Sequence, residues 1–443
     1  MNYELINNLI PDEYKSLEHF IQNAYPADIA DLIMELSGEE LNFILDKYPT
    51  EQMGEIISFF DYETSNYVSR YFSELTLSEI MLNMYSDDAV DFLGTMTVGK
   101  VKKILNNMRD NEAQELQRLL GYDEESAGGI MTTEYIAFYA DHTADIVLEK
   151  LRKIVAGPEM IYYVYVISRT KELLGVLSVR ELLAAQPDIR IRDIMTDKVI
   201  SVEIDLDQEE VAHILSKYDL LAVPVINKND QLMGIITVDD VIDVIEDEAT
   251  EDMYKMAATA DIYDVKGGLI AAVKKRIPWL LILLVGDLLS GSVIKTFEAS
   301  LQAIVVLAIF IPVLMDMGGN VGTQSLTVVV RGLATGELHF SNFWRHLWQE
   351  IKVGFIMALV LGIIIALLAY FWQGNFILGL IVGSSMFITL LTAVIAGTTI
   401  PFIIEALGAD PAIAAGPFIT TLIDISGLFI YFTLATILME KIL

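Results

Sequence analysis

Apolar and polar positions follow two different patterns along the chain. Up to about residue 265, apolar residues recur at helical or strand spacing between polar ones, which is typical of water-soluble domains. Beyond that point they form five long runs, at about 278–296, 301–330, 353–372, 376–404 and 411–439. Each run is long enough to cross roughly 30 Å of hydrocarbon. The pattern predicts a multi-domain membrane protein, with a soluble half followed by a transmembrane domain of five helices.

Two domains are expected in the soluble half. Residues 1–125 are predicted to form an acidic, all-α N-domain, because stretches such as PTEQMGEIISFFD place apolar residues at helical spacing. Residues 126–250 contain a degenerate repeat, in which IMTTEYIAF returns as IMTDKVISV and GVLSVRELL returns as GIITVDDVI. Each copy predicts strand, helix, strand, strand and helix, hence an α/β unit. Residues 251–276 are then expected to form a linking helix, and residues 277–443 the transmembrane domain.

Charge is divided between the same two halves. The 443-residue chain has a formal net charge of −32, yet acidic and basic residues balance from residue 266 onward, so the soluble half carries the whole excess. Such a surface argues against nucleic acid as a partner, because phosphates need Lys and Arg, and it favours cations. The chain contains no cysteine, so disulfides and thiolate metal sites are excluded.

Basic residues at the start of the transmembrane domain predict its orientation. Lys274, Lys275 and Arg276 precede the first apolar run, which places the soluble half in the cytoplasm by the positive-inside rule. By alternation the basic loop at 331–352 is also cytoplasmic, and the C-terminus lies outside after five spans. We therefore expect a multi-pass protein of the cytoplasmic membrane.

Three carboxylates lie inside the apolar runs, at Asp287, Asp316 and Asp424. Charges at such positions are costly and usually functional. No Lys or Arg lies between Lys352 and Lys441, so a counter-ion from elsewhere or a permeating cation must neutralise Asp424. The alternative is a protonated Asp424 in a helix contact.

The last run also contains two prolines. Pro411 and Pro417 each remove a backbone donor, and we expect them to break the segment twice and expose carbonyl groups to a wet cavity. The structure of this segment therefore decides whether backbone carbonyls lie beside Asp424.

Uncharged polar side chains indicate what lines such a path. Asn320 and Gln324 are four residues apart and hence on one helical face, within PVLMDMGGNVGTQS, although the glycines of this stretch equally fit close helix packing. Thr420 and Thr421 add hydroxyl groups near Asp424. A lining of oxygen atoms suits a hard cation such as Mg²⁺ or Ca²⁺, and a ring of Asp424 carboxylates could hold a hydrated Mg²⁺. A ring needs more than one copy of the chain, most simply a two-fold homodimer.

The repeat in residues 126–250 resembles a tandem pair of CBS domains. The motif G-h-x-[ST]-x-x-[DN] is matched in the second copy by Gly234, Thr237 and Asp240. The resemblance implies a nucleotide such as ATP as a ligand of the pair, with Asp240 on the ribose and Thr237 beside it. The first copy has Glu181 at the last position of the motif, which departs from the pattern and leaves ATP open.

Acidic residues crowd several places in the soluble half, including Asp239, Asp240 and Asp243, and EDEATED at 246–252. Asp87 and Asp91 lie four residues apart on one helical face, for which a solvated acidic surface is the simpler interpretation. Crowded carboxylates repel one another unless a cation lies among them. A rise in divalent cation would therefore compact this half, and residues 246–276 could carry the change to the membrane.

Taken in order, these parts resemble the MgtE family of magnesium channels, most specifically in PVLMDMGGNVGTQS and DPAIAAGPFITTLIDISG. The resemblance implies a homodimer in which Asp424 binds hydrated Mg²⁺ in the pore. It also implies cytosolic Mg²⁺ sites that close the pore when Mg²⁺ is plentiful. By position, their ligands would be Asp87, Asp91, Glu209, Asp219, Asp240, Asp243, Glu251, Asp252 and Asp410.

The expected function is a Mg²⁺-selective channel for magnesium uptake, closed by feedback. An ion-coupled secondary transporter of Mg²⁺ or another divalent cation is the alternative, with Asp287 or Asp316 in a second ion site. A membrane-anchored nucleotide sensor is a third hypothesis, and it predicts no role for Asp424. The sequence contains no nucleophile–base pair or catalytic metal spacing, so an enzyme is not expected.

Overall fold

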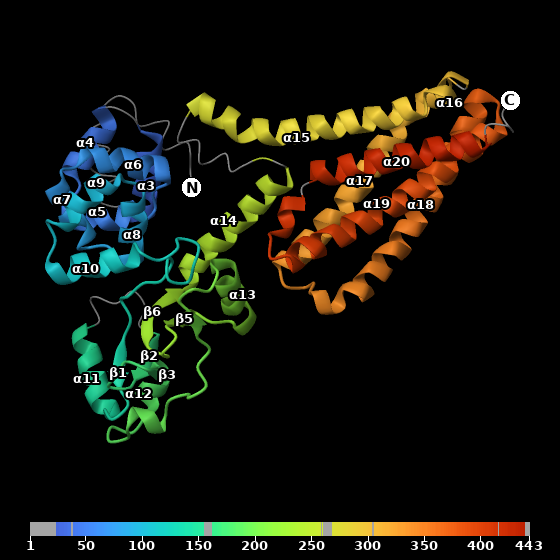
Figure 1. The fold of residues 1–443 in the computed structure, drawn as a ribbon. Coiled ribbons are helices and arrows are strands. Elements are labelled where there is room, and N and C mark those ends of the chain that lie inside the picture. The colour runs from blue at the N-terminus through green and yellow to red at the C-terminus, as the bar shows by residue number, and fades with distance from the viewer. Residues whose placement is uncertain are drawn as a thin grey trace. The chain divides into compact units, whose positions relative to one another are not determined.

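The computed structural model describes residues 24–36, 39–154, 162–257, 259, 268–303, 305–414 and 416–438. The chain divides into two compact units, Met1–Ile245 and Glu246–Leu443. The strands and most of the short helices belong to the first unit, and the long apolar helices belong to the second (Figure 1). Helix α14 (Val238–Met256) begins in the first unit and ends in the second.

The N-terminal domain is helical, as expected. Its helices are α3 (Pro26–Glu35), α4 (Glu39–Lys47), α5 (Thr50–Ile57), α6 (Tyr62–Tyr71), α7 (Glu74–Met81), α8 (Ser86–Gly94), α9 (Val98–Leu105) and α10 (Asp110–Leu119). Side-chain caps begin two of them, since Asp61 accepts a hydrogen bond from the Thr64 N–H and Ser73 accepts one from the Thr76 N–H. Helix α5 packs against α3 and α7, and α8 packs against α10.

Two copies of one α/β unit follow. The first consists of β1 (Ala137–Tyr139), α11 (Ala144–Ile154), β2 (Tyr163–Ile167), β3 (Leu173–Ser178) and α12 (Val179–Ala184). After the short helix η1 (Ile191–Asp193), the second consists of β4 (Val202–Glu203), α13 (Gln208–Tyr218), β5 (Ala222–Ile226), β6 (Leu232–Thr237) and α14. In each three-stranded sheet the first strand runs parallel to the second, and the third runs antiparallel to the second. The predicted repeat is therefore a structural repeat.

The two copies exchange their leading segments. Thr132, before the first copy, pairs with Ile235 on β6, and Thr196, before the second copy, pairs with Val176 on β3. The core of the second copy is continuous with that of the N-terminal domain, whereas the first copy has a core of its own. The N-terminal domain thus packs on the second copy.

The second unit is built mainly from long helices. They are α15 (Gly268–Thr296), α17 (Leu307–Ala334), α18 (Phe343–Gln373), α19 (Phe376–Ala406) and α20 (Gly416–Leu438), with the short helices α16 (Glu298–Ala303), η2 (Phe340–Asn342) and η3 (Pro411–Ala414) between them. Helix α17 packs against α19 and α20, α18 packs against α19, and α15 packs against α20 (Figure 1). At about 1.5 Å per residue, even α20 is about 35 Å long.

Four stretches of the described residues are long and apolar enough to cross a membrane: Arg276–Thr296, Phe340–Gln373, Phe376–Ala406 and Gly416–Leu438. Helix α17 has 28 residues but is not among them, because Asp316, Asn320 and Gln324 lower the hydropathy of its middle. The apolar helical domain is as expected, and the fifth span stays a prediction.

The last apolar segment differs from its prediction. Pro411 lies in η3, and Pro417 lies in the first turn of α20, where a proline removes no intrahelical hydrogen bond. Helix α20 is therefore continuous from Gly416 to Leu438, and the expectation of two breaks that expose carbonyl groups inside the segment is wrong. Of the predicted linking helix, residues 251–256 end α14 and residues 268–276 begin α15, while 258 and 260–267 lie outside the described residues.

Candidate functional site

Three helices bring the intramembrane carboxylates together. Asp287 lies on α15, Asp316 on α17 and Asp424 on α20, and the charges of Asp287 and Asp316 act on the Asp424 carboxyl group. Asp424 is half-buried, whereas Asp287 and Asp316 are exposed in the single chain. The sequence supplied three separate positions, and the fold makes them one group, called here the membrane cluster.

Small residues allow these helices to approach closely. A Cβ atom at Gly319 on α17 would lie 2.9 Å from Cγ2 of Thr420 on α20, and one at Gly286 on α15 would collide with Cγ2 of Thr421. Two neighbouring threonines of α20 thus face two different helices, α17 and α15. The glycines of PVLMDMGGNVGTQS therefore serve close helix packing, the alternative considered from the sequence.

The uncharged residues predicted to line an ion path differ in their surroundings. The Thr420 and Thr421 hydroxyl groups both donate to the Pro417 carbonyl, with oxygen–oxygen distances of 2.8 and 2.9 Å, so each keeps only acceptor capacity toward a cation. Asn320 and Gln324 are exposed on one face of α17 in the single chain. These amide and hydroxyl oxygens lie on the helices that carry Asp316 and Asp424, and oxygen donors are the kind that Mg²⁺ prefers.

A second acidic group lies within the first unit and is called here the junction cluster: Asp88 and Asp91 of α8, and Asp240 of α14. Burial and the charges of Asp240 and Asp91 raise the pKa of Asp88 to about 7. Burial and the charges of Asp240 and Glu124 raise the pKa of Asp91 to about 7. Burial also raises the pKa of Asp240 to about 6, although its hydrogen bond from Thr237 acts in the opposite direction.

Of the predicted ligands, Asp91 and Asp240 lie in this cluster together with Asp88, which the sequence analysis did not single out, and their role as Mg²⁺ ligands stays a prediction. Asp88 and Asp91 are three residues apart, a spacing that shares a helical face as well as four does. Asp87 is buried within α8, whereas the charge interactions of the cluster join Asp88, Asp91 and Asp240. Spacing along the sequence therefore could not decide between Asp87 and Asp88, and the choice required their positions in the fold.

Glu134 holds the start of α8 beside the α/β repeat. Its Oε2 accepts hydrogen bonds from Ser86 N (3.3 Å), Ser86 Oγ (2.8 Å) and Thr132 Oγ1 (2.6 Å). A carboxylate at a helix N-terminus satisfies free N–H groups and interacts well with the helix dipole. The same carboxylate adds negative charge beside Asp88. Glu134 therefore positions the junction cluster and strengthens its field.

The other predicted regulatory ligands of the second copy are spread out. Glu209 lies in the first turn of α13 and Asp219 is its left-handed C-cap, so about 15 Å of helix separates them. Asp243 lies one turn after Asp240 on α14 and adds to the charge on it. The fold thus brings Asp243 toward the junction cluster but does not bring Glu209 and Asp219 to one point.

Glu251, Asp252 and Asp410 come together in the second unit, where Lys255 joins them. Lys255 Nζ lies 2.5 Å from Glu251 Oε1 and 2.7 Å from Asp410 Oδ2. Burial and the charges of Asp410 and Glu251 raise the pKa of Asp252, against the effect of Lys255 and Arg331. These four residues are called here the Lys255 cluster. Lys255 was missed, although its position four residues after Glu251 is a common ion-pair spacing.

The predicted nucleotide contacts bond to each other. Asp240 Oδ2 accepts from Thr237 N at 3.3 Å and from Thr237 Oγ1, and Thr237 is fully buried. In the first copy, Ser178 and Glu181 form the same kind of capping box at the start of α12. Both motifs thus stabilise helix starts, and a ligand at Asp240 would meet a carboxylate that already has a partner.

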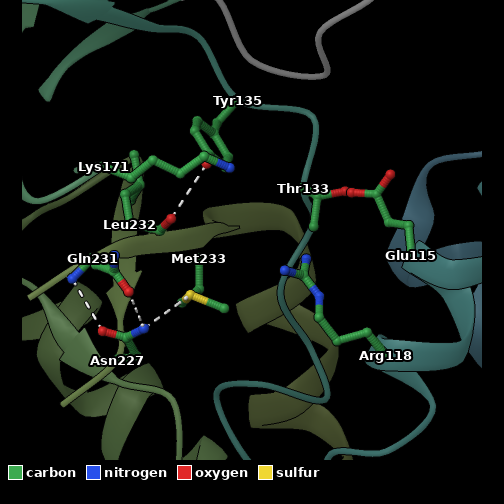
Figure 2. A pocket seen from close by; sticks show the side chains of 9 residues that line it. All are labelled: Glu115, Arg118, Thr133, Tyr135, Lys171, Asn227, Gln231, Leu232 and Met233. Carbon is green, nitrogen blue, oxygen red and sulfur yellow. Dashed lines mark hydrogen bonds between the residues drawn. The ribbon is translucent and has the colours of Figure 1, made fainter. Parts of the chain in front are cut away.

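A separate cavity of about 320 Å³ lies in the first unit, and neither Thr237 nor Asp240 lines it (Figure 2). Arg118 and Glu115 come from α10, and Asn227 donates to Gln231 Oε1 at 3.0 Å on the other side. Tyr135 OH donates to the Leu232 carbonyl at 3.4 Å. The cavity is polar, and none of its lining residues belongs to the three acidic clusters.

Within the described part of the chain, no three or more His, Cys, Asp or Glu side chains are arranged to hold a metal ion. The three clusters are therefore concentrations of charge and not complete coordination shells. Mg²⁺ usually keeps several waters and binds through one or two carboxylates, so oxygen-rich clusters of this kind fit it.

Comparison with protein families assigns most of the chain to known domains. Residues 24–125 match the MgtE intracellular N domain, residues 127–188 and 191–247 match the CBS domain, and residues 311–434 match the MgtE divalent cation transporter domain. The matched segments follow one another in the order of the structural domains.

Individual relatives match over nearly the whole chain. The magnesium transporter MgtE of Bacillus subtilis is 38% identical over 94% of this chain and 92% of its own, and that of Thermus thermophilus is 35% identical over 97% and 96%. Two crystal structures match the soluble half, each with a TM-score of 0.50. One is the soluble part of a magnesium transporter (31% identity, 56% of this chain, 96% of that chain), and the other is the cytosolic domain of the Mg²⁺ channel MgtE in complex with ATP (33%, 53% and 95%). This chain is therefore a transporter rather than an enzyme, and it belongs to the MgtE family of magnesium transporters.

Proposed function

We propose that the protein is a Mg²⁺-selective channel for magnesium uptake across the cytoplasmic membrane, closed by Mg²⁺ binding to its acidic cytosolic clusters. The membrane cluster carries the proposal. Asp287, Asp316 and Asp424 lie on three helices, the charges of the first two act on Asp424, and no Lys or Arg lies between Lys352 and Lys441 to neutralise it. Removing the water shell of Mg²⁺ costs a large free energy. Carboxylates that accept hydrogen bonds from the waters bound to Mg²⁺ avoid that cost.

The path is completed by a second copy of the chain. Asp287, Asp316, Asn320 and Gln324 are all exposed in the single chain, on helices α15 and α17. Exposed carboxylates facing lipid would be strongly unfavourable, and a two-fold partner or a water-filled path removes that cost. We accordingly assign α17 as the fifth span, which places the C-terminus outside.

The junction cluster supplies the closing signal. Its carboxylates have pKa values of about 6 to 7, so at neutral pH they share protons and repel one another. A divalent cation entering the cluster displaces the protons and draws α8 toward α14. That cation therefore tightens the packing of the N-terminal domain on the second CBS copy.

The membrane cluster favours a channel over a coupled transporter. Coupling needs a second ion site, and Asp287 and Asp316 act on the same carboxyl group, Asp424, instead of forming a site elsewhere. The three carboxylates therefore fit a single cation-binding region along the ion path.

The test is Mg²⁺ influx into liposomes that contain the purified protein. Asp424→Asn keeps the side-chain volume but removes the charge, and it should lower influx by about tenfold or more. Glu337→Gln, on an exposed residue between α17 and η2, is the matched loss of one carboxylate and should leave influx unchanged. Full influx through the Asp424→Asn protein would overturn the assignment of the pore.

A further inference from the structure

Lys255 occupies the position that a cation would take between two acidic elements of the second unit. It lies in the last turn of α14, and its ammonium group contacts Glu251 one turn earlier and Asp410 just before η3. The other Asp410 oxygen, Oδ1, accepts the Ala412 N–H at 2.8 Å, which fixes the carboxylate at the start of the segment that leads into α20. One lysine thus connects the end of α14 to the entrance of α20.

Packing supports the same contact. Met256 packs against the core of the membrane helices, and a Cβ atom at Gly416, the first residue of α20, would lie 3.4 Å from the Met256 carbonyl oxygen. The end of α14 therefore lies directly against the beginning of the helix that carries Asp424. A change in the position of α14 would therefore alter the packing at Gly416.

The charges of this region are nearly balanced without a metal ion. Glu251, Asp252 and Asp410 contribute three negative charges, and Lys255 and Arg331 contribute two positive ones. A divalent cation added to this set would create an excess of positive charge beside Lys255. If Lys255 moves away, Glu251 and Asp410 lose their ion pairs, and the set has excess negative charge that a divalent cation can neutralise.

We propose that Lys255 is a positioning residue of the gate: its ammonium group holds Glu251 and Asp410 together and must be displaced before a divalent cation can bind between them. This inference rests on the proposed gating by Mg²⁺ and names the residue that sets its threshold. Lys255 keeps α14 docked when divalent cations are scarce, and it competes with them when they are present. The Mg²⁺ concentration at which the cluster fills is therefore higher than three free carboxylates would require.

The test measures the distance between α14 and the end of α19. The chain has no cysteine, so Met253→Cys and Leu407→Cys, both on exposed side chains, provide two unique sites for spin labels. Pulsed dipolar spectroscopy on full-length protein in liposomes, diluted with unlabelled chain, reports the docked fraction with chelator and during a Mg²⁺ titration. The background variants are Lys255→Met, Lys255→Arg and Lys153→Met. Lys153 forms a comparable ion pair with Glu149 four residues earlier but contacts no second carboxylate among the described residues, so it serves as the matched control.

Lys255→Met should lower the docked fraction in chelator and shift the Mg²⁺ midpoint for docking about fivefold downward. Lys255→Arg should keep both values near those of the parent, because the positive charge remains, and Lys153→Met should change neither. An unchanged docked fraction in chelator, or a Mg²⁺ midpoint that stays the same or rises, would overturn the proposal. Absence of Mg²⁺-dependent docking in the parent would instead count against gating at this cluster, and failure of Mg²⁺ influx would count against the channel.

Discussion

The junction cluster and the Lys255 cluster contain the same kind of residue but have opposite charge balance. At the junction, Asp88 and Asp240 are half-buried and Asp91 is exposed, and reduced hydration together with mutual repulsion moves their pKa values to about 6 to 7. At the end of α14, Lys255 contacts two carboxylates at 2.5 and 2.7 Å. The bonds to Asp410 and Glu251 outweigh the effect of burial and raise the pKa of Lys255.

The difference shows that acidic residues alone do not define a cation site. The junction cluster lacks a basic residue among the charges that shift Asp88 and Asp91, so protons or added cations must neutralise it. The Lys255 cluster carries its own cation. When Mg²⁺ rises, it should neutralise the excess negative charge of the junction cluster. At the Lys255 cluster it should instead replace the ammonium group of Lys255.

The largest expected effect is on the pH dependence of stability. Because the pKa values of Asp88 and Asp91 lie above their ordinary value of 3.8, protonation stabilises the folded state below that value, and this stabilisation is lost as the pH rises toward about 7. Without divalent cations, the intact protein should lose on the order of 3 kcal/mol between pH 4 and pH 8 from this cluster, a figure reduced for solvent screening because Asp91 is exposed. Thermal unfolding in chelator, followed at both pH values, measures it.

A double variant separates this cluster from the remaining charges. Asp88→Asn with Asp91→Asn should raise the melting temperature at pH 8 in chelator and abolish most of the stabilisation by Mg²⁺. Glu79→Gln, an exposed acid on α7, should do neither. Identical responses of the parent and the double variant to pH and Mg²⁺ would show that the junction is not the titrating cluster.

The next effect distinguishes two neighbouring residues. Asp88→Asn should raise the Mg²⁺ concentration needed for closure by about tenfold, because it removes one of the carboxylates on which Asp240 acts. Asp87→Asn should have a smaller effect on closure, because Asp88 and Asp91 are the carboxylates on which the charge of Asp240 acts. Mg²⁺-dependent shutdown of influx, compared between the two variants, gives the answer, and a larger effect for Asp87 would restore the sequence-based choice.

The smallest effect concerns the residues that the fold keeps apart. Asp219→Ala with Asp243→Ala should leave maximal influx intact and weaken its shutdown by Mg²⁺ about threefold. Asp219 lies at the far end of α13 from Glu209, and only Asp243 acts on the junction cluster. Unchanged inhibition of the double variant would remove both residues from the sensor.

The sequence predicted much of this architecture because its signals are periodic. Helical spacing, the repeat at 130–250 and the length of the apolar runs gave the domain order and the long helices, and Asp424 stood out by its depth. These features depend on neighbouring residues along the chain.

Features that depend on distant residues were not accessible. Lys255 and Asp410 are far apart in sequence and meet only when α14 packs on the start of α20. Asp287 and Asp316 joined Asp424 through close packing at Gly286 and Gly319. In both cases tertiary packing decided a question that local pattern left open. Pro417 is different: the preference of proline for the first turn of a helix is a local signal that could have predicted its place at the start of α20.

Patch recording from the purified protein in liposomes tests the central claim most directly, with cytoplasmic-side Mg²⁺ stepped from nominally zero to about 10 mM. The account predicts discrete Mg²⁺ currents that disappear as cytoplasmic Mg²⁺ rises, and that the Asp424→Asn protein lacks. Saturable Mg²⁺ uptake without any current steps would contradict the channel and favour coupled transport, and currents that persist at high Mg²⁺ would contradict the closing role of the acidic clusters.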